Sequence, residues 1–468
     1  MLFSDIHDFY RKIKGKKVAF IGIGVSHSEL IRKAASCGAL VTLCDKRSED
    51  KIPEAAELKE MGVMLSLGEE YLNNIDADIV FRTPGMYFEH PALRKLRQAG
   101  VCITSEMELF FELCPCKIYA ITGSDGKTTT SNLIARMLAE SGKTVHLGGN
   151  LGRALLPVCD QISHDDCAVV ELSSFQLISM RQSPDVAVIT NVAPNHLDVH
   201  KDMQEYIDAK KNIFMHQNGF SRLILNRDND ITRAMQADAR GSVEWFSYSR
   251  GEDFLSTLHL NGAFLDGEGN VMLKDREGIH KIMHKSLIKL PGEHNVENYL
   301  TAISAVGGEV GADVVRRVAA EFGGVEHRIE LVREVGGARY YNDSIASSPT
   351  RTIAGLKSFD RKVILIAGGY DKNIPYAPLA PYIKENVKLL ITMGTTAPKI
   401  EAALSEDATP LPIPETVRVN DMAEAVSLAH KRAAEGDVVL MSPASASFDK
   451  YKNFEERGRH FKELVNSL

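Results

Sequence analysis

The sequence has few of the features that mark a secreted or membrane-inserted protein. Its first residues, MLFSDIHDFYRKIKGK, contain no apolar core of a signal peptide, and no apolar run is long enough to span a bilayer. The 468 residues include only seven cysteines, which are scattered rather than spaced as a disulfide framework. Cys114-Pro115-Cys116 is shorter than the usual Cys-x-x-Cys pair and is interpreted as linker. We therefore expect a cytoplasmic protein that does not insert into a membrane.

An excess of positive charge is also missing. The net charge of −7 argues against a protein that binds nucleic acid over much of its surface, and leaves room only for a local basic pocket. With 44% hydrophobic and 25% charged residues, the chain has the composition of an ordinary globular protein. Its length suggests about three domains.

The most informative segment present is a glycine loop between a predicted strand and a predicted helix. Apolar residues 118–121 precede the loop, and residues 130–141 follow it with the spacing of an amphipathic helix. Glycines let backbone N–H groups turn toward an anion, and a helix N-terminus favours negative charge. We interpret the loop as a polyphosphate site in which Lys127 reaches a terminal phosphate and Thr128 ligates Mg²⁺. The loop reads Gly123-Ser124-Asp125-Gly126-Lys127-Thr128-Thr129.

The spacing of this loop differs from that of a Walker A loop. A Walker A loop has a glycine five residues before the Gly-Lys pair, and here that position is Ile121. What remains is the shorter Gly-x-x-Gly-Lys-Thr. We favour phosphate binding, and the alternative is a strand–turn–helix connection without a ligand.

The first block of the sequence predicts a βαβ unit over residues 17–45. Its turn, Gly22-x-Gly24, begins a dinucleotide fingerprint, but His27 occupies the position of the third glycine. One interpretation is a phosphate-bearing ligand on the helix that starts near Ser26, with Asp45 or Arg47 beside its sugar or phosphate. The other is a tight turn without a ligand. A second turn, residues 83–86, follows the predicted strand 79–81 at the end where open α/β sheets bind ligands.

Polar residues follow two predicted strands in the central block. Glu171 comes directly after the strand 167–170, where phosphate-loop proteins place a Mg²⁺ ligand or its water partner. His196 lies in the loop after the strand 186–190. Either residue alone has a structural explanation. Together with Thr128 on parallel strands, they favour a metal site.

Lys210 is a local anomaly in the predicted helix 203–214. Apolar residues at 203, 206, 207, 213 and 214 form the buried stripe of an amphipathic helix, and Lys210 stands in the middle of it. A bare ammonium on a buried face is costly unless it is paired, neutralised or modified. One interpretation is that Lys210 extends past the stripe to water. The other is a lysine carbamylated by CO₂, which supplies an anionic oxygen ligand for a second Mg²⁺.

The third block again alternates strands and helices, with predicted strands at 338–341, 363–367, 389–393 and 438–441 and a helix at 422–435. Residues 405–416 are interpreted as a surface loop. The whole chain is predicted to be α/β in three domains. These are a Rossmann-like domain (residues 1–105), a central P-loop mononucleotide-binding domain (106–324) and a Rossmann-like C-terminal domain (325–468).

Taken together, these motifs resemble the Mur ligases of bacterial cell-wall synthesis. The resemblance runs over all three blocks, and the last three motifs look like those of the D-glutamate-adding branch. The Asp-Asn-Pro-Arg signature of members that add meso-diaminopimelate or lysine is absent. The motifs are Gly123 to Thr129, Glu171-Leu-Ser-Ser, Asn191 to Asp198, Tyr206-x-x-x-Lys210, Gly292-Glu-His294-Asn295-x-x-Asn298, His327-Arg328, Tyr341-Asn342-Asp343-Ser344, Gly368 to Lys372, and Ser442 to Asp449.

The resemblance implies an ATP-dependent amide ligase of peptidoglycan precursor synthesis. Its small-molecule substrates would be UDP-N-acetylmuramoyl-L-alanine, D-glutamate and ATP. The reaction would pass through an acyl phosphate and a tetrahedral intermediate. The resemblance further implies two Mg²⁺ ions, which Mn²⁺ can replace, CO₂ held as the carbamate of Lys210, and a monomer that binds no nucleic acid.

The resemblance also implies a role for each matching residue. Val25, Ser26, Lys46 and Arg47 would lie near the uridine diphosphate, and Asn150 would contact the muramoyl-peptide. Asn298, Arg328 and Asp343 would complete the ATP site around the loop Gly123 to Thr129. Thr128 and Glu171 would bind one Mg²⁺, and His196 and carbamylated Lys210 the other. Lys372, Ser447, Phe448 and Phe454 would hold D-glutamate. The catalytic residues would be Lys127, His196, Lys210 and Lys372.

Two departures from the family pattern matter. Ile345 stands where many D-glutamate adders have a lysine, so charge must be balanced in another way, and His27 replaces a glycine in the first turn. Competing interpretations are another Mur member, a folylpolyglutamate synthase, a P-loop kinase and a nucleotide-regulated binding protein. The first block argues against the folate enzyme, and Lys210 with the complete third block argues against a kinase.

Overall fold

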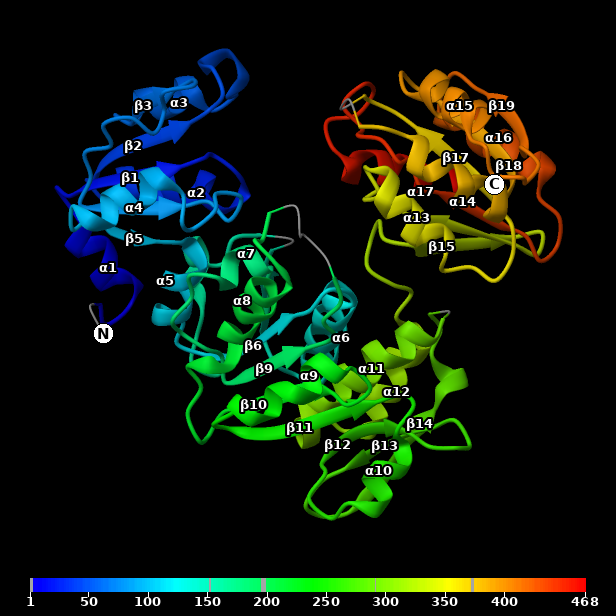
Figure 1. Ribbon diagram of the computed structural model, residues 1–468, viewed down its shortest axis with the longest axis horizontal. Coiled ribbons are helices and arrows are strands. Elements are labelled where there is room, and N and C mark those ends of the chain that lie inside the picture. The colour runs from blue at the N-terminus through cyan, green and yellow to red at the C-terminus, as the bar shows by residue number, and fades with distance from the viewer. Residues whose placement is uncertain (1–2, 151–152, 195–198, 291, 372–373) are drawn as a thin grey trace. The chain divides into compact units, whose positions relative to one another are not determined.

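The computed structural model describes residues 3–150, 153–194, 199–290, 292–371 and 374–468 (Figure 1). The chain divides into two compact units. The first comprises Met1–Ile288 and Glu293–Ala320, and the second comprises Lys289–Gly292 and Glu321–Leu468. The first unit contains two sheets and the second contains one. Within the described ranges, no helix is long and apolar enough to cross a membrane.

The first sheet has five parallel strands in the order β3-β2-β1-β4-β5. This order reverses direction between β1 and β4, and open α/β sheets bind ligands at such a switch point, beyond the carboxyl ends of the strands. The strands are β1 (Lys17–Ile21), β2 (Leu40–Asp45), β3 (Met64–Leu67), β4 (Ile79–Arg82) and β5 (Cys102–Thr104), with helices α1 (Ile6–Ile13), α2 (Val25–Ser36), α3 (Ala55–Glu60) and α4 (Pro91–Gln98).

The second sheet has nine strands in the order β14-β13-β12-β11-β10-β9-β6-β8-β7. The strands from β7 to β12 are parallel, and β13 and β14 extend the sheet as antiparallel strands. The bounds are β6 (Lys117–Thr122), β7 (Val145–Gly149), β8 (Cys167–Glu171), β9 (Val186–Ile189), β10 (Arg222–Asn226), β11 (Ser242–Ser247), β12 (Gly262–Leu265), β13 (Asn270–Lys274) and β14 (Ile279–His284).

The helices of this second block connect and cover its strands. Helix α6 packs on both β8 and α11, so the phosphate-loop helix lies against the centre of the sheet. The bounds are α5 (Glu106–Leu113), α6 (Lys127–Glu140), α7 (Ser174–Leu177), α8 (Met203–Met215), α9 (Asp230–Ala234), α10 (Gly251–Ser256), α11 (Glu293–Val306) and α12 (Ala312–Glu321), with a 3₁₀ helix η2 (Leu156–Gln161).

The sheet of the second unit has six strands in the order β15-β16-β20-β17-β18-β19, all parallel except the β15–β16 pair. Every residue of β17 is buried, as expected for a parallel strand covered on both faces. The strands are β15 (Glu330–Val335), β16 (Ala338–Asn342), β17 (Val363–Gly368), β18 (Val387–Met393), β19 (Glu415–Arg418) and β20 (Val438–Met441).

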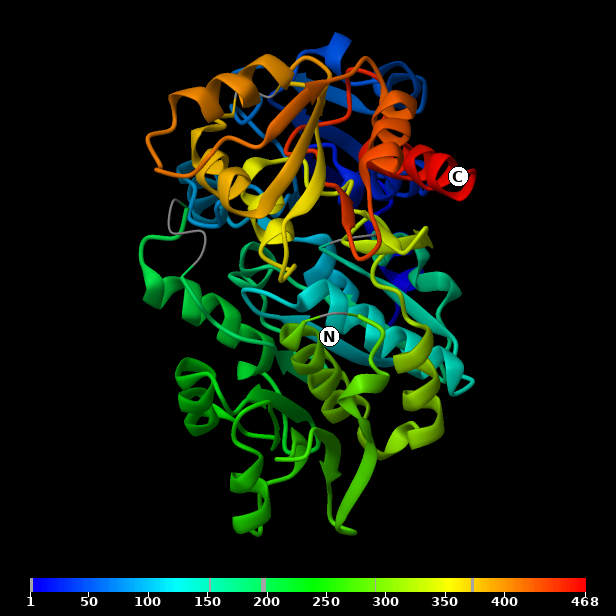
Figure 2. The ribbon, with the colours of Figure 1, turned by 90° about the vertical axis from the view of Figure 1, so that its right-hand side faces the viewer.

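Five helices flank this sheet. Helix α17 packs against α16 and the β15–β16 pair, and its red ribbon marks the C-terminus in Figure 2. The helices are α13 (Pro349–Leu356), α14 (Ala380–Asn386), α15 (Ala397–Glu406), α16 (Met422–Arg432) and α17 (Phe454–Asn466).

The three α/β blocks confirm the predicted fold class. Two local expectations differ from the structure. The phosphate-loop helix begins at Lys127, not at Thr130, because the left-handed Gly126 already caps it. Residues 415 and 416, expected in a loop, begin the edge strand β19. The boundaries at 105/106 and 324/325 stay predictions.

Candidate nucleotide and substrate sites

The phosphate loop connects the end of β6 to the start of α6, and only glycine fits its two tightest positions. Gly126 has φ +78°, and a Cβ there would lie 2.5 Å from Oδ1 of Asn298. Gly123 has φ +150°, and a Cβ there would lie 1.8 Å from Oγ1 of Thr190. The same approach brings Asn298, a predicted nucleotide-site residue on α11, against the loop.

Residues from the end of the neighbouring strand β9 hold this loop in place. The N–H groups of Ser124 and Asp125 donate to the carbonyl and side-chain oxygens of Asn191, at 2.9 and 3.0 Å. The Thr190 hydroxyl donates to the Asp125 carbonyl at 2.6 Å, and the Ser124 hydroxyl lies 3.0 Å from that of Tyr206. The loop conformation is therefore fixed by the protein itself, as preorganised anion binding requires.

Lys127 and Thr128 occupy the first turn of α6. The Lys127 ammonium donates to the carbonyls of Gly123 and Ser124 at 2.9 and 3.0 Å, so its charge lies over the loop. Thr128 is buried and Thr129 is half-buried. A cation and a hydroxyl beside a helix N-terminus suit a polyphosphate and its metal ion.

Glu171 ends β8, the strand beside β6, in register with Ile121. Its carboxylate is buried and accepts from Nδ2 of Asn150 at 3.0 Å, while the Asn150 N–H donates to the Glu171 carbonyl at 2.7 Å. Gly149 makes this contact close, because a Cβ there would lie 2.3 Å from the Glu171 carbonyl oxygen. Glu171, the expected metal ligand, and Asn150, the expected substrate contact, are thus adjacent.

Lys210 is buried, so the interpretation that it extends to water is wrong. Its Nζ donates to the Gly123 carbonyl at 2.8 Å and lies 4.6 Å from the ring centroid of Tyr206. Burial, and then the charge of Lys127, hold the pKa of Lys210 well below its ordinary value. The Lys210 side chain therefore reaches the backbone of the phosphate loop, and its lowered pKa favours the neutral amine.

The predicted metal ligands are only partly within the described residues. Thr128 belongs to the loop, Glu171 ends the strand beside β6, and Lys210 donates to the Gly123 carbonyl. His196 belongs to residues 195–198, which lie outside the described part of the chain. In that described part, no group of three or more His, Cys, Asp or Glu side chains is arranged to hold a metal. The oxygen donors Thr128 and Glu171 nevertheless match the ligand preference of Mg²⁺.

The glycine turn of the first block is held by the pair Asp45–Arg47. Asp45 accepts from the N–H of Ile23 at 2.9 Å, and Arg47 Nη2 donates to Asp45 at 2.9 Å and to the Ile23 carbonyl at 2.7 Å. Arg47 therefore braces the turn, while Lys46 is largely exposed and pairs with Glu69. Val25 begins α2, and Ser26 follows it in the first helical turn.

His27 replaces the glycine of the usual turn, and its ring contacts the backbone and the aromatic side chains around that turn. Its Nδ1 lies 2.8 Å from the Gly22 carbonyl, and its ring packs against Phe20 and Phe81. Burial lowers the pKa of His27 to about 4, so the ring is neutral and donates from Nδ1. The side chain thus ties α2 to the turn that precedes it.

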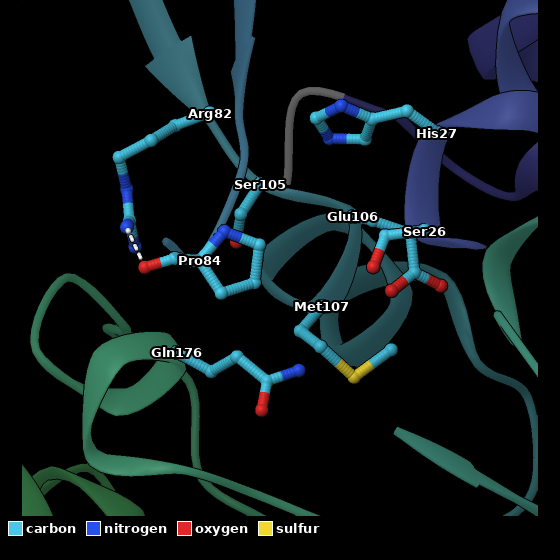
Figure 3. A pocket seen from close by; sticks show the side chains of 8 residues that line it. All are labelled: Ser26, His27, Arg82, Pro84, Ser105, Glu106, Met107 and Gln176. Carbon is cyan, nitrogen blue, oxygen red and sulfur yellow. Dashed lines mark hydrogen bonds between the residues drawn. The ribbon is translucent and has the colours of Figure 1, made fainter. Parts of the chain in front are cut away.

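A small pocket lies beside the first turn of α2 (Figure 3). Arg82, a buried residue at the end of β4, donates to the carbonyls of Met86 and Phe175 at 2.8 and 3.1 Å and to the Ser179 hydroxyl at 3.0 Å. Its guanidinium thereby joins the first sheet to the segment around α7, a role that the sequence analysis missed. The pocket is lined by Ser26, His27, Arg82, Pro84, Ser105, Glu106, Met107 and Gln176.

Asp343 is a buried carboxylate of the second unit. Burial raises the pKa of Asp343 to about 7. A 2.7 Å hydrogen bond from the Ser442 hydroxyl and the charges of Arg328 and Arg351 lower the pKa, but by less than burial raises it. Ile345 carries no charge, and its N–H donates to the His327 carbonyl at 3.1 Å. Two arginines near Asp343 therefore supply positive charge in a site where the sequence lacks the usual lysine.

Three of the remaining predicted residues of the second unit lie in the segment 444–454. Ser447 is buried and Phe454 is half-buried, whereas Phe448 is exposed, with its ring 6.0 Å from that of Tyr370. Lys372 lies outside the described residues.

Arg457 organises this segment and was missed by the sequence analysis. Its guanidinium is buried and donates to the Ser344 carbonyl at 2.8 Å and to the carbonyls of Ser445 and Ala446 at 3.0 Å. The sequence signal that could have identified Arg457 is the one that identified Lys210, a charged residue on the apolar stripe of a helix. Arg457 lies on the helical stripe formed by Phe454, Gly458, Phe461 and Val465.

Comparison with protein families gives two matches on this chain. Residues 121–306 match the Mur ligase middle domain, and residues 327–445 match the Mur ligase glutamate ligase domain. The first match begins in β6 and contains the phosphate loop, Glu171, Lys210 and Asn298. The second contains Arg328 and Asp343.

Similar curated proteins extend over the whole chain. The UDP-N-acetylmuramoylalanine–D-glutamate ligase of Acetivibrio thermocellus is 53% identical over 473 aligned positions, which cover 99% of both chains. Proteins with the same name from Clostridium kluyveri and Ruminiclostridium cellulolyticum are 49% and 46% identical, again with 99% of both chains covered.

Solved structures support the fold at much lower identity. A UDP-N-acetylmuramate–alanine ligase from Thermotoga maritima has a TM-score of 0.56 at 19% identity, covering 97% of this chain and 99% of its own. A pseudomurein peptide ligase type C from Methanothermus fervidus has a TM-score of 0.52 at 18% identity, with the same coverage.

Proposed function

The chain belongs to the Mur ligase family, and we propose that it joins D-glutamate to UDP-N-acetylmuramoyl-L-alanine in an ATP-dependent reaction of peptidoglycan precursor synthesis. The observation that carries the proposal is full-length identity near 50% to several ligases of that name. The fixed phosphate loop, with Lys127 over it, supplies the matching chemistry.

The reaction needs a phosphate loop because a carboxylate is a poor acyl donor. Transfer of the ATP γ-phosphoryl group to the alanyl carboxylate makes an acyl phosphate, whose leaving group is phosphate. The D-glutamate amine then attacks the acyl carbon, and the tetrahedral intermediate expels phosphate. Two anions meet in the first step, so positive charge from Lys127 and the N-terminus of α6 lowers its barrier.

We assign Thr128 and Glu171 to a Mg²⁺ ion bound with ATP. The hydroxyl of Thr128 in the first turn of α6 and the buried carboxylate of Glu171 at the end of β8 are oxygen donors of the kind this ion takes. Such an ion would neutralise charge on the phosphates during transfer. His196 and the Lys210 carbamate are the proposed ligands of a second ion.

The burial of the Lys210 amine supports a carbamate at this residue. A neutral amine adds to CO₂ to form a carbamate and releases one proton, and the low pKa of Lys210 favours the neutral form. Replacing the residue with alanine should reduce turnover about 100-fold or more, in line with the loss of one transition-state group. A short carboxylic acid such as acetate or propionate should restore part of the activity, because it supplies the missing carboxylate.

Lys211→Ala is the matched control for this experiment. Lys211 is the next residue of α8 and pairs with Asp238 away from the loop. We expect this variant to keep near-normal turnover with no response to added acid. An equal response of both variants to acid would contradict the carbamate.

Each substrate is assigned its own set of residues. Ser26, Val25, Lys46 and Arg47 are proposed for the uridine diphosphate, with Asn150 at the muramoyl-peptide. Asn298, Arg328 and Asp343 are proposed for ATP. Lys372, Ser447, Phe448 and Phe454 are proposed for D-glutamate.

Phosphate release tests the function directly. The full chain should release phosphate from ATP only when UDP-N-acetylmuramoyl-L-alanine and D-glutamate are both present. Replacing D-glutamate with L-glutamate, L-alanine, L-lysine or meso-diaminopimelate should leave release at background. ATP turnover that is indifferent to D-glutamate would overturn the proposal and favour a kinase or a nucleotide-regulated protein.

A further inference from the structure

The segment between α5 and β6 contains two cysteines whose sulfur atoms nearly touch. Sγ of Cys114 lies 3.6 Å from Sγ of Cys116, a distance at which one thiol donates to the other. Cys114 is half-buried, whereas Cys116 is only 6% exposed. This Cys-Pro-Cys segment, interpreted from its sequence as linker, also brings a thiol pair together.

We propose that Cys114 and Cys116 form a redox-active dithiol that closes into an internal disulfide by exchange with small disulfides such as glutathione disulfide. The proposal concerns a modification site outside the ligase chemistry and does not depend on the proposed function.

The geometry allows closure with little movement. A disulfide holds its sulfurs about 2.05 Å apart, so the two atoms must approach by about 1.5 Å. Cys114 follows the last residue of α5 and Cys116 precedes β6, so neither belongs to a helix or a strand. Pro115 fixes its own φ between them, which restricts the segment to few conformations.

Exposure assigns the two thiols different tasks. Cys114 is the more accessible thiol and is therefore the one that attacks an external disulfide. The hydrogen bond shared with Cys114, and then burial, raise the pKa of Cys116, so this thiol keeps its proton until the second step.

The exchange balances in two steps. The Cys114 thiolate attacks one sulfur of glutathione disulfide, forms a mixed disulfide and expels one glutathione thiolate. Cys116 then loses its proton, attacks the Cys114 sulfur and expels the second glutathione. The dithiol loses two electrons and two protons, and glutathione disulfide gains them.

The position of the pair favours reversible rather than structural bonding. A cross-link between residues 114 and 116 closes a very short loop, so it removes little entropy from the unfolded chain. Its effect is local instead. Cys116 adjoins Lys117, the first residue of β6, and β6 leads into the phosphate loop.

Mass spectrometry of the full-length chain tests the proposal. The protein is equilibrated with glutathione and glutathione disulfide, quenched with acid, alkylated and digested with trypsin. Cys102 shares the tryptic peptide of the pair, so the Cys102→Ser variant gives the clearer measurement. With excess glutathione disulfide, we expect Cys114 and Cys116 in that peptide to carry neither an alkyl group nor glutathione. Dithiothreitol should restore both alkylation sites.

Single variants separate the two thiols. Cys116→Ser should accumulate a glutathione adduct at Cys114, because no thiol remains to displace it. Cys159→Ser should still form the internal disulfide, although Cys159 lies nearby, with its Sγ 3.7 Å from the Leu113 carbonyl. Full alkylation at excess glutathione disulfide, separate adducts on Cys114 and Cys116, or a Cys116–Cys159 linkage would each overturn the proposal.

Discussion

Lys127 is the residue whose charge the proposed reaction uses most directly. Its ammonium lies on the carbonyls of Gly123 and Ser124, above the loop that would hold the ATP phosphates. In Lys127→Ala, the negative charge that gathers during phosphoryl transfer would lose its nearest fixed cation. We expect kcat to fall about 100- to 1,000-fold. Because the proposed uridine diphosphate residues lie in the first block, the Kd of the UDP-linked substrate should change less than about threefold. Steady-state kinetics and calorimetric titration measure the two quantities.

Lys143→Ala provides the matched control for this prediction. Lys143 is an exposed lysine just beyond the C-terminus of α6, so its removal changes the same net charge without touching the loop. This variant should keep the wild-type kcat and Kd. If Lys127→Ala weakened substrate binding as strongly as it slowed turnover, the assignment of Lys127 to phosphoryl transfer would be wrong.

Helix α5 is joined to η2 through a buried carboxyl group. Both N–H groups of Leu155 and Leu156 donate to Oε1 of Glu106, at 3.0 and 2.8 Å. Burial raises the pKa of Glu106 to about 7, above its ordinary value of 4.5. The native state therefore binds the proton more tightly than the unfolded state, and stability is lost as pH rises from about 4.5 through about 7. At about 1.4 kcal/mol per pKa unit, ionisation costs on the order of 3 kcal/mol.

Glu106→Gln should remove this pH dependence while keeping an oxygen for both N–H groups. We expect the Tm of the variant to exceed that of the wild type at pH 8, with the difference shrinking toward zero near pH 4.5. Thermal melts across this pH range measure the effect. Glu60→Gln, an exposed residue on α3, is the control and should show no such trend. A constant difference between Glu106→Gln and wild type at every pH would contradict the role of ionisation.

Elements with a short-range signature were predictable from the sequence. The loop from Gly123 to Thr129 carries its pattern within seven residues, and the buried Lys210 stood out against its own helical stripe. Residues whose partners are distant in sequence were not predictable. Arg82 bonds Ser179 and Glu106 bonds Leu155, and those partners become neighbours only when the chain folds. Local patterns report which face is buried, but not which backbone groups meet it there.

At the scale of the whole molecule, the second unit has what an independent domain requires. Its six-stranded sheet carries one apolar cluster around Leu365, Leu390 and Leu440 and another around Ile364, Ile366 and Met441. Alternate residues of β17 enter different clusters, so both faces of the sheet are covered within this unit. Arg457 adds bonds from α17 to Ser344 and Ala446 that are also internal to the unit.

We therefore expect the fragment 321–468 to fold without the rest of the chain. It should show a single cooperative thermal transition by circular dichroism, with the stability of about 5–15 kcal/mol that is usual for domains. Ile366→Ala in the fragment should cost about 2–5 kcal/mol, because it empties part of a fully buried cluster. For a domain of this size, that loss lowers Tm by roughly 5–20 °C. The exposed substitution Leu411→Ala, outside both clusters, should shift Tm by no more than a few degrees. A fragment that unfolds gradually, or that responds equally to both substitutions, would show that the second unit depends on the first for its core. The predicted domain boundary at 324/325 would then be wrong.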